Sequence, residues 1–95
     1  MLQVLKYPIP VEDVASVELP EGYRVLSIQV QRNMPMLWAL VDPNSNVPKV
    51  TLQIHIVSTG FEMPTEANLN AYLGTIQLDQ GTIVYHLFEG MVYAK

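Results

Sequence analysis

The two histidines have the widest chemical range of any side chains in this sequence. His86 lies between the large apolar residues Tyr85 and Leu87, and His55 lies in a stretch that alternates apolar and polar residues. A histidine beside apolar neighbours either stays neutral and hydrogen-bonded within the fold, or it donates a hydrogen bond to a ligand in a pocket. Both interpretations stay open for His86. The polar side on which we place His55 indicates a surface or an interface.

The remaining residues do not indicate a catalytic or metal centre. The chain has no cysteine, which excludes disulfides, thiolate nucleophiles and thiolate metal sites. It has no Gly-x-Ser-x-Gly turn, no glycine-rich phosphate loop, and no spacing of His, Asp and Glu that is typical of a metal site. Because nothing assembles a nucleophile, a base and an orienting group, we predict that the protein is not an enzyme and uses no metal or cofactor.

Uncharged polar side chains occupy the outward positions of three expected strands. They are Ser27, Gln29 and Gln31, then Thr51, Gln53 and His55, then Thr75 and Gln77. A buried amide costs much less free energy than a buried charge, so such a face suits a polar surface that is covered by a ligand or by another subunit. The alternative is an ordinary wet sheet face that is poor in charge, since strands favour Thr and tolerate Gln there.

The tryptophan and the arginines complete the set of candidate ligand contacts. Trp38 lies in the apolar run Met36–Val41, which predicts a core anchor, with an aromatic platform for a ring as the second interpretation. The five basic residues do not cluster and the net charge is −4, which argues against nucleic acid, although Arg24 or Arg32 can hold a small anion. The predicted ligand-binding residues are Arg24, Gln29, Gln31, Trp38, Gln53, His55, Gln77 and His86.

Short strands between Gly and Pro turns must position these side chains. We expect strands over 2–7, 14–19, 49–58, 73–79 and 82–89, a hairpin within 24–42, and a tail over 90–95 that pairs or frays. Residues 65–73 fit a short helical turn or an irregular loop. This pattern predicts a single all-β, mainly antiparallel domain over 1–95, a sandwich or small barrel of about six to seven strands.

Two turns and one buried arm are expected in particular. We place the hairpin turn at Asn33-Met34-Pro35 and give Pro20 and Gly22 the second and fourth positions of the preceding turn. Leu26, Ile28 and Val30 are predicted to point inward. Met36–Val41 is apolar at every position, so we expect a strand that is covered on both faces.

Composition bounds the setting of the domain. Hydrophobic residues make up 49% of the chain and charged ones 15%, which suggests that another chain covers some apolar surface, as in a homo-oligomer. The first residues do not resemble a signal peptide, and no apolar run is long enough to cross a bilayer. We therefore expect a protein of the cytoplasm.

Several short motifs resemble a group of small proteins encoded by bacteriophages and prophages. In chain order they are Lys6-Tyr7-Pro8, Glu18-Leu19-Pro20-x-Gly22, Leu26-Ser27-Ile28-Gln29-x-Gln31, Leu37 to Pro43, Thr59-Gly60, Gly74-Thr75 and His86-x-Phe88-Glu89. The group has no established activity and no known catalytic residues. Its hairpin turn is usually Asn-Gly, whereas Met34 follows Asn33 here, which argues against a two-residue turn.

The resemblance implies a phage accessory protein in the cytoplasm of the host cell, a class that often interferes with host defence. The first hypothesis is a homo-oligomer that sequesters a small ligand, namely a nucleotide-derived immune signal. The second is a protein–protein inhibitor of a host defence factor, and the third is a minor virion or assembly component.

Overall fold

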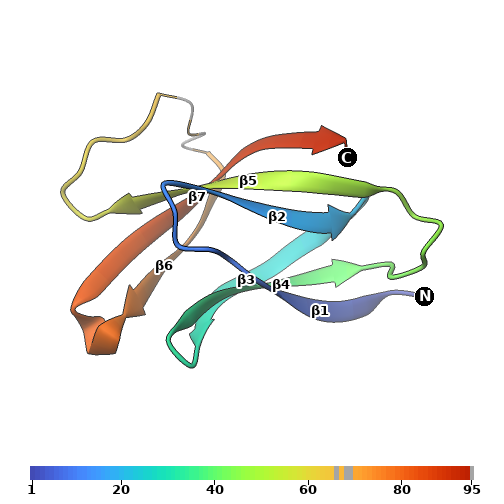
Figure 1. Ribbon diagram of the computed structural model, residues 1–95, viewed down its shortest axis with the longest axis horizontal. Coiled ribbons are helices and arrows are strands. Elements are labelled where there is room, and N and C mark those ends of the chain that lie inside the picture. The colour runs from blue at the N-terminus through green and yellow to red at the C-terminus, as the bar shows by residue number, and fades with distance from the viewer. Residues whose placement is uncertain (66, 68–69, 95) are drawn as a thin grey trace.

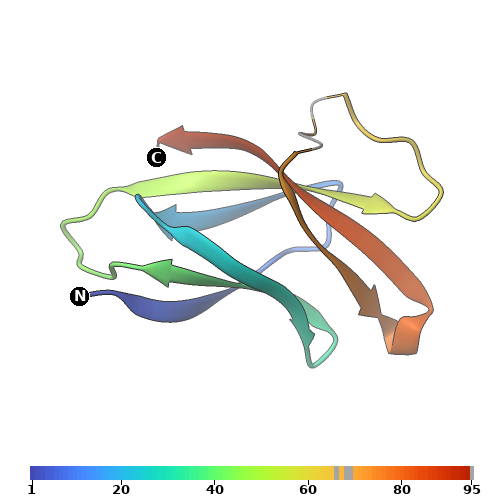
Figure 2. The ribbon, with the colours of Figure 1, turned by 180° about the vertical axis from the view of Figure 1, so that it is seen from behind.

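Seven strands form two antiparallel sheets in the computed structural model, which describes residues 1–65, 67 and 70–94. Sheet A has the order β1-β4-β3, and sheet B has the order β2-β5-β7-β6. The strands are β1 (Gln3–Pro8), β2 (Val14–Pro20), β3 (Arg24–Gln31), β4 (Met34–Val41), β5 (Lys49–Ser58), β6 (Tyr72–Leu78) and β7 (Ile83–Ala94). Figure 1 shows the two sheets as two layers, and Figure 2 shows the same layers from behind. Both sheets are open over the described residues, so the expected all-β fold is confirmed as a sandwich and not a barrel.

The core lies between the sheets and follows from alternation along the strands. In β2, Ala15, Val17 and Leu19 are buried while Ser16 and Glu18 are exposed, as their period of two predicts. In β5, whose bounds match the prediction, Leu52 and Ile54 are fully buried. The other buried members of the core cluster are Ile9, Ile28, Leu37, Ala39, Val41, Ile56, Ile76 and Leu87.

The β3–β4 hairpin closes with a two-residue turn, which corrects the expected position at 33–35. Arg32 and Asn33 have φ values of 53° and 61°, the left-handed pair that a type I′ turn requires. Pro35 lies within β4, buried and opposite Val30, and its carbonyl accepts a hydrogen bond from the Ile9 amide at 3.0 Å. Asn33 also accepts a hydrogen bond from the Asp79 amide at 2.8 Å, which joins this hairpin to the β6–β7 connection.

Strand β4 is buried on one face only, so the prediction of an arm covered on both faces is wrong. Leu37, Ala39 and Val41 point into the core, while Met36, Trp38 and Leu40 are half-buried on the outer face of sheet A. Trp38 is therefore not the core anchor that its neighbours suggested. An unbroken apolar run does not distinguish a strand between two layers from an edge layer with an apolar outer side.

A β-bulge overturns one further expectation in β3. The register shifts between Val25 and Ser27, which leaves Leu26 unpaired and 48% exposed instead of inward. The turn before β3 is also displaced by one residue from the prediction. The Tyr23 amide donates to the Pro20 carbonyl at 3.2 Å, so Pro20 is the first residue of this turn and Gly22, with φ of 83°, is the third.

The last hairpin joins β6 to β7 at the expected place, and the connection is a 3-10 turn, Asp79–Gly81, which the sequence did not predict. The tail does not fray over its described part, because Val92, Tyr93 and Ala94 pair with β5. Tyr72 and Leu73, which we considered for a helical turn, belong to β6. Glu66, Asn68 and Leu69 of the expected turn lie outside the described residues.

Candidate functional site

The eight predicted ligand-binding residues fall on two opposite faces of the sandwich. Gln53, His55, Gln77 and His86 lie on the outer face of sheet B, and Arg24, Gln29, Gln31 and Trp38 lie on the outer face of sheet A. The core separates these faces, so the two halves do not line one pocket within a single chain. The uncharged polar side chains that we expected to form one surface are therefore divided between the two sheets.

His86 is held at both ring nitrogens by threonine hydroxyl groups. Its Nε2 lies 2.7 Å from Thr59 Oγ1, and its Nδ1 lies 2.9 Å from Thr75 Oγ1. The Tyr72 hydroxyl group continues this row through a hydrogen bond to Thr75. Each hydroxyl group can donate or accept, so the row satisfies a neutral imidazole in either tautomer.

A hydroxyl group beside a histidine, as in Thr59 and His86, resembles the nucleophile and base of a catalytic triad, but the charge that a triad requires is absent from this row. In such a triad a buried carboxylate orients the histidine and stabilises its charged form during proton transfer. The neutral Thr75 hydroxyl group occupies that position here, so the row offers no carboxylate to stabilise an imidazolium. The geometry indicates that His86 joins β6 to the segment that follows β5.

His55 is buried on the outer face of sheet B, which the sequence did not indicate. Its side chain is 4% exposed, and its Nδ1 has no hydrogen-bond partner among the described residues. The facing strand makes room for the ring with a glycine: a Cβ on Gly90 would lie 2.9 Å from His55 Nε2. The prediction of a surface or interface position for His55 is therefore replaced by a buried imidazole whose Nδ1 has no hydrogen-bond partner among the described residues.

Trp38 occupies the centre of the outer face of sheet A. Across β4 it faces Lys6 of β1 on one side and Ser27 of β3 on the other. The flanking rows are Leu40 with Val4 and Arg24, and Met36 with Pro8 and Gln29. Directly opposed side chains of antiparallel strands have Cβ atoms roughly 5 Å apart, so Trp38 is surrounded on all sides by these residues.

Positive charge gathers on this outer face although the whole chain is acidic. Lys6 reaches across it and donates a hydrogen bond to the Gln31 side-chain oxygen. Neither Lys6 nor Arg24 forms an ion pair with a carboxylate in the described part of the chain. The sequence did not indicate the role of Lys6, because only the β1–β4 register brings it beside Trp38.

A second feature missed by the sequence lies at the open seam between the sheets. Tyr23 and Glu89 line a cavity of about 450 Å³ there, together with the bulged residues Leu26 and Leu73. Burial raises the pKa of the Tyr23 phenol, and the negative charge of Glu89 and its hydrogen bond to the phenol raise that pKa further. Bulges often aim side chains at a site, but no periodicity in the sequence predicts them.

The part of the chain that the structure describes contains no helix with the length and apolar character needed to span a bilayer. Within the same residues, no group of three or more His, Asp or Glu side chains is arranged to hold a metal ion.

The comparisons with known proteins give a family without an activity. A family model described as a domain of unknown function (DUF7352) matches residues 1–94. No curated protein and no solved structure matches the chain.

Proposed function

We propose that this chain, which belongs to the DUF7352 family, is a non-enzymatic binding protein that holds a small anionic ligand of nucleotide type on the outer face of sheet A. The observation that carries the proposal is the position of Trp38, half-buried at the centre of the face with Lys6 beside it and Arg24 in the next row. The family description names no activity, so the argument depends on these residues alone.

The side chains around Trp38 fit the parts of a nucleotide. An indole ring stacks on a base irrespective of its identity, and each stacked base contributes about 1–3 kcal/mol. Ammonium and guanidinium groups bind phosphate oxygens through charge-assisted hydrogen bonds, for which Lys6 and Arg24 are available. Gln29 adds an amide that can donate to or accept from a base edge.

The resemblance to phage and prophage proteins suggests a biological role for this binding. A protein that sequesters a nucleotide-derived immune signal needs affinity and abundance but no catalysis. We therefore propose a phage accessory protein that counters host defence by sequestration and that works as a homo-oligomer. The phage origin and the host setting are parts of this proposal.

Fluorescence of the single tryptophan tests the proposal directly, because the signal comes only from Trp38. We expect saturable changes on titration with a cyclic dinucleotide or a cyclic ADP-ribose isomer, with weaker binding at higher salt. Lys6→Ala and Arg24→Ala should each weaken binding roughly tenfold, or about 1.4 kcal/mol. Lys49→Ala removes a cation from sheet B and should leave binding unchanged. The absence of a saturable change with every nucleotide, or an equal loss in Lys49→Ala, would overturn the proposal.

An inhibitor of a host protein is the second candidate, and the same face supports it. Val4 and Met34 on this face are 55% and 45% exposed, and Trp and Arg are among the side chains most enriched in binding hot spots. A stoichiometric partner recovered from host lysate and lost in Trp38→Ala, together with no response to nucleotides, would favour this function over the first.

A further inference from the structure

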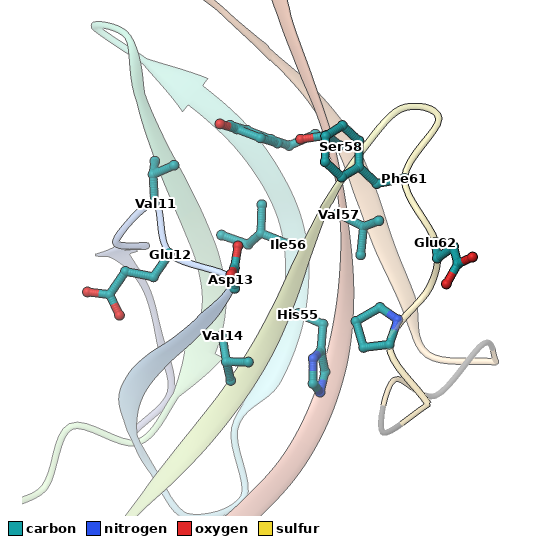
Figure 3. A pocket seen from close by; sticks show the side chains of 12 residues that line it. Val11, Glu12, Asp13, Val14, His55, Ile56, Val57, Ser58, Phe61 and Glu62 are labelled. Atoms are coloured by element: carbon teal, nitrogen blue, oxygen red, sulfur yellow. The ribbon is translucent and has the colours of Figure 1, made fainter.

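A cleft at the end of β5 lies apart from the Trp38 face. Its walls are the segment before β2, residues 11–14, the last part of β5, residues 55–58, and the segment after it, which includes Phe61, Glu62 and Pro64. Figure 3 shows Glu12 and Asp13 on one side, Phe61 and Glu62 on the other, and His55 and Val57 between them. The cavity volume is about 470 Å³, within the range of roughly 300–1,000 Å³ that small-ligand sites have.

The cleft exists because the pairing of β2 with β5 stops at Val14 and His55, before β5 ends. Val14 is the first residue of β2 and lies opposite His55. One further contact follows, in which the Ile56 amide donates to the Asp13 carbonyl at 3.1 Å. Beyond it, residues 57–58 have no partner strand on this side among the described residues, so the edge of β5 is open to the cavity.

His55 gives the cleft an unsatisfied polar atom. Its Nδ1 is buried and lacks a partner among the described residues, and His55 is one of the residues that line the cavity. A buried polar atom without a hydrogen bond lowers the stability of the fold, and a ligand group can recover that free energy by bonding to it. In the tautomer that carries the proton on Nε2, Nδ1 accepts a hydrogen bond from an N–H donor.

The charge of the cleft selects the sign of its ligand. Glu12, Asp13 and Glu62 line it, whereas no Lys or Arg does among the described residues. The rest of the lining is largely apolar, with Val57 and the 75% exposed Phe61. An anion would meet only like charges here, and a neutral apolar compound would leave His55 unsatisfied.

We propose that this cleft binds a compound in which an ammonium or guanidinium group is carried on a short apolar chain or ring. The cationic nitrogen lies in the negative potential of the three carboxylates, and it donates a hydrogen bond to His55 Nδ1 when the ring turns toward the cleft. The apolar part contacts Val14, Val57 and Phe61. The site is separate from the Trp38 face in both position and preferred charge.

Proton NMR of the two histidine rings tests this assignment with benzylamine, benzyl alcohol and benzoate as matched probes. The His86→Gln variant identifies which ring signals belong to His55. We expect benzylamine, which is cationic at neutral pH, to shift the His55 signals saturably and at least tenfold more tightly than benzyl alcohol. Benzoate should produce no shift. N-acetyl-arginine methylamide distinguishes the source of the cation: tighter binding than benzylamine indicates an arginine of a protein partner, and weaker binding indicates a free amine.

Exposed carboxylates provide variants that leave the core intact. The combined change Glu12→Gln, Asp13→Asn and Glu62→Gln should weaken benzylamine binding at least tenfold, while Glu21→Gln, in the turn after β2, should have no effect. The proposal is overturned if benzoate binds as well as benzylamine, if no probe shifts His55, or if the triple variant binds unchanged while its amide spectrum stays dispersed. A failure here leaves the Trp38 titration unaffected, so the two proposals fail separately.

Discussion

At the scale of single residues, the pair formed by Tyr23 and Glu89 couples the stability of the sandwich to pH. The phenol is held near the carboxylate at the seam between the sheets, and burial followed by Glu89 raises its pKa above 10.0. The folded chain therefore keeps this proton at pH values at which the unfolded chain has begun to lose it. The stabilisation is complete below pH 10 and declines as the pH rises from the unfolded value through the folded pKa.

Tyr23→Phe should lower the free energy of unfolding by about 1 kcal/mol at neutral pH, because the hydrogen bond to Glu89 is lost. The difference in the free energy of unfolding between wild type and Tyr23→Phe should become smaller between about pH 9 and 11, because only wild type loses the contribution of this phenol there. Urea unfolding across that range measures both effects. Tyr7→Phe is the matched control. Burial alone raises the pKa of Tyr7, without a carboxylate, so its difference from wild type should change less over this pH range. A constant difference between wild type and Tyr23→Phe across this range would contradict the expected coupling.

The two histidines show what residue-level reading of the sequence can and cannot supply. Of the two interpretations that the sequence left open for His86, the hydrogen bonds to Thr59 and Thr75 agree with a histidine that is bonded within the fold. Those partners are 27 and 11 residues away in sequence, so only the strand register brings them together. His55 was placed on the correct face, but its burial was not predicted, because the glycine that makes room for its ring, Gly90, lies on a neighbouring strand.

At the scale of elements, the β3–β4 hairpin turn carries a measurable strain. Arg32 takes a left-handed φ of 53°, which costs roughly 1 kcal/mol for most residues and less for Asn. Arg32→Asn should therefore raise the free energy of unfolding by about 0.5–1 kcal/mol. Chemical denaturation measures the change, and Arg24→Asn, an arginine in extended backbone, should show no such gain. Equal effects of the two substitutions would exclude backbone strain as the cause.

A substitution of Asn33, the second residue of the same turn, distinguishes the effect of backbone conformation from the effect of hydrogen bonding. Asn33→Gly accommodates φ of 61° without strain but removes the side-chain oxygen that accepts from the Asp79 amide. We expect a loss of about 1 kcal/mol on unfolding by denaturant, despite the more favourable turn residue. Stabilisation by Asn33→Gly would show that the bond between the two hairpins contributes little.

Element boundaries were largely predictable, whereas the bulges were not. Alternation gave the observed bounds of β5 and, to within one residue, those of β2, and it placed the inner faces of both strands correctly. The same alternation placed Leu26 inward, because a period of two continues through a pattern in which the structure inserts an extra residue. The bulged residues Leu26 and Leu73 line the seam cavity, which the alternation therefore did not predict. Lys6 was missed for another reason, because it lies beside Trp38 through the regular but long-range pairing of β1 with β4.

At the scale of the whole molecule, the end of β7 offers a surface for a second copy. Strand β6 reaches β7 only as far as the Phe88 pairing and the bond from the Glu89 amide to the Ala71 carbonyl. Residues 90–94 therefore have one free edge among the described residues. Met91, Val92 and Tyr93 are consecutive and 59%, 51% and 42% exposed. Three adjacent exposed apolar residues on an unpaired edge are typical of a segment that another strand covers.

We expect this edge to pair with the same edge of a second copy, which would join the two copies of sheet B and leave each Trp38 face free for ligand. Val92→Lys places a charge on the edge and should convert the oligomer into a monomer, as measured by light scattering after size-exclusion chromatography. Leu2→Lys is the matched control, because Leu2 is 65% exposed but precedes β1. Because β7 keeps its pairing with β5 in Val92→Lys, the circular dichroism spectrum should stay unchanged. A wild-type chain that is monomeric at micromolar concentration, or a Val92→Lys variant that keeps the mass of the oligomer, would place any self-association elsewhere.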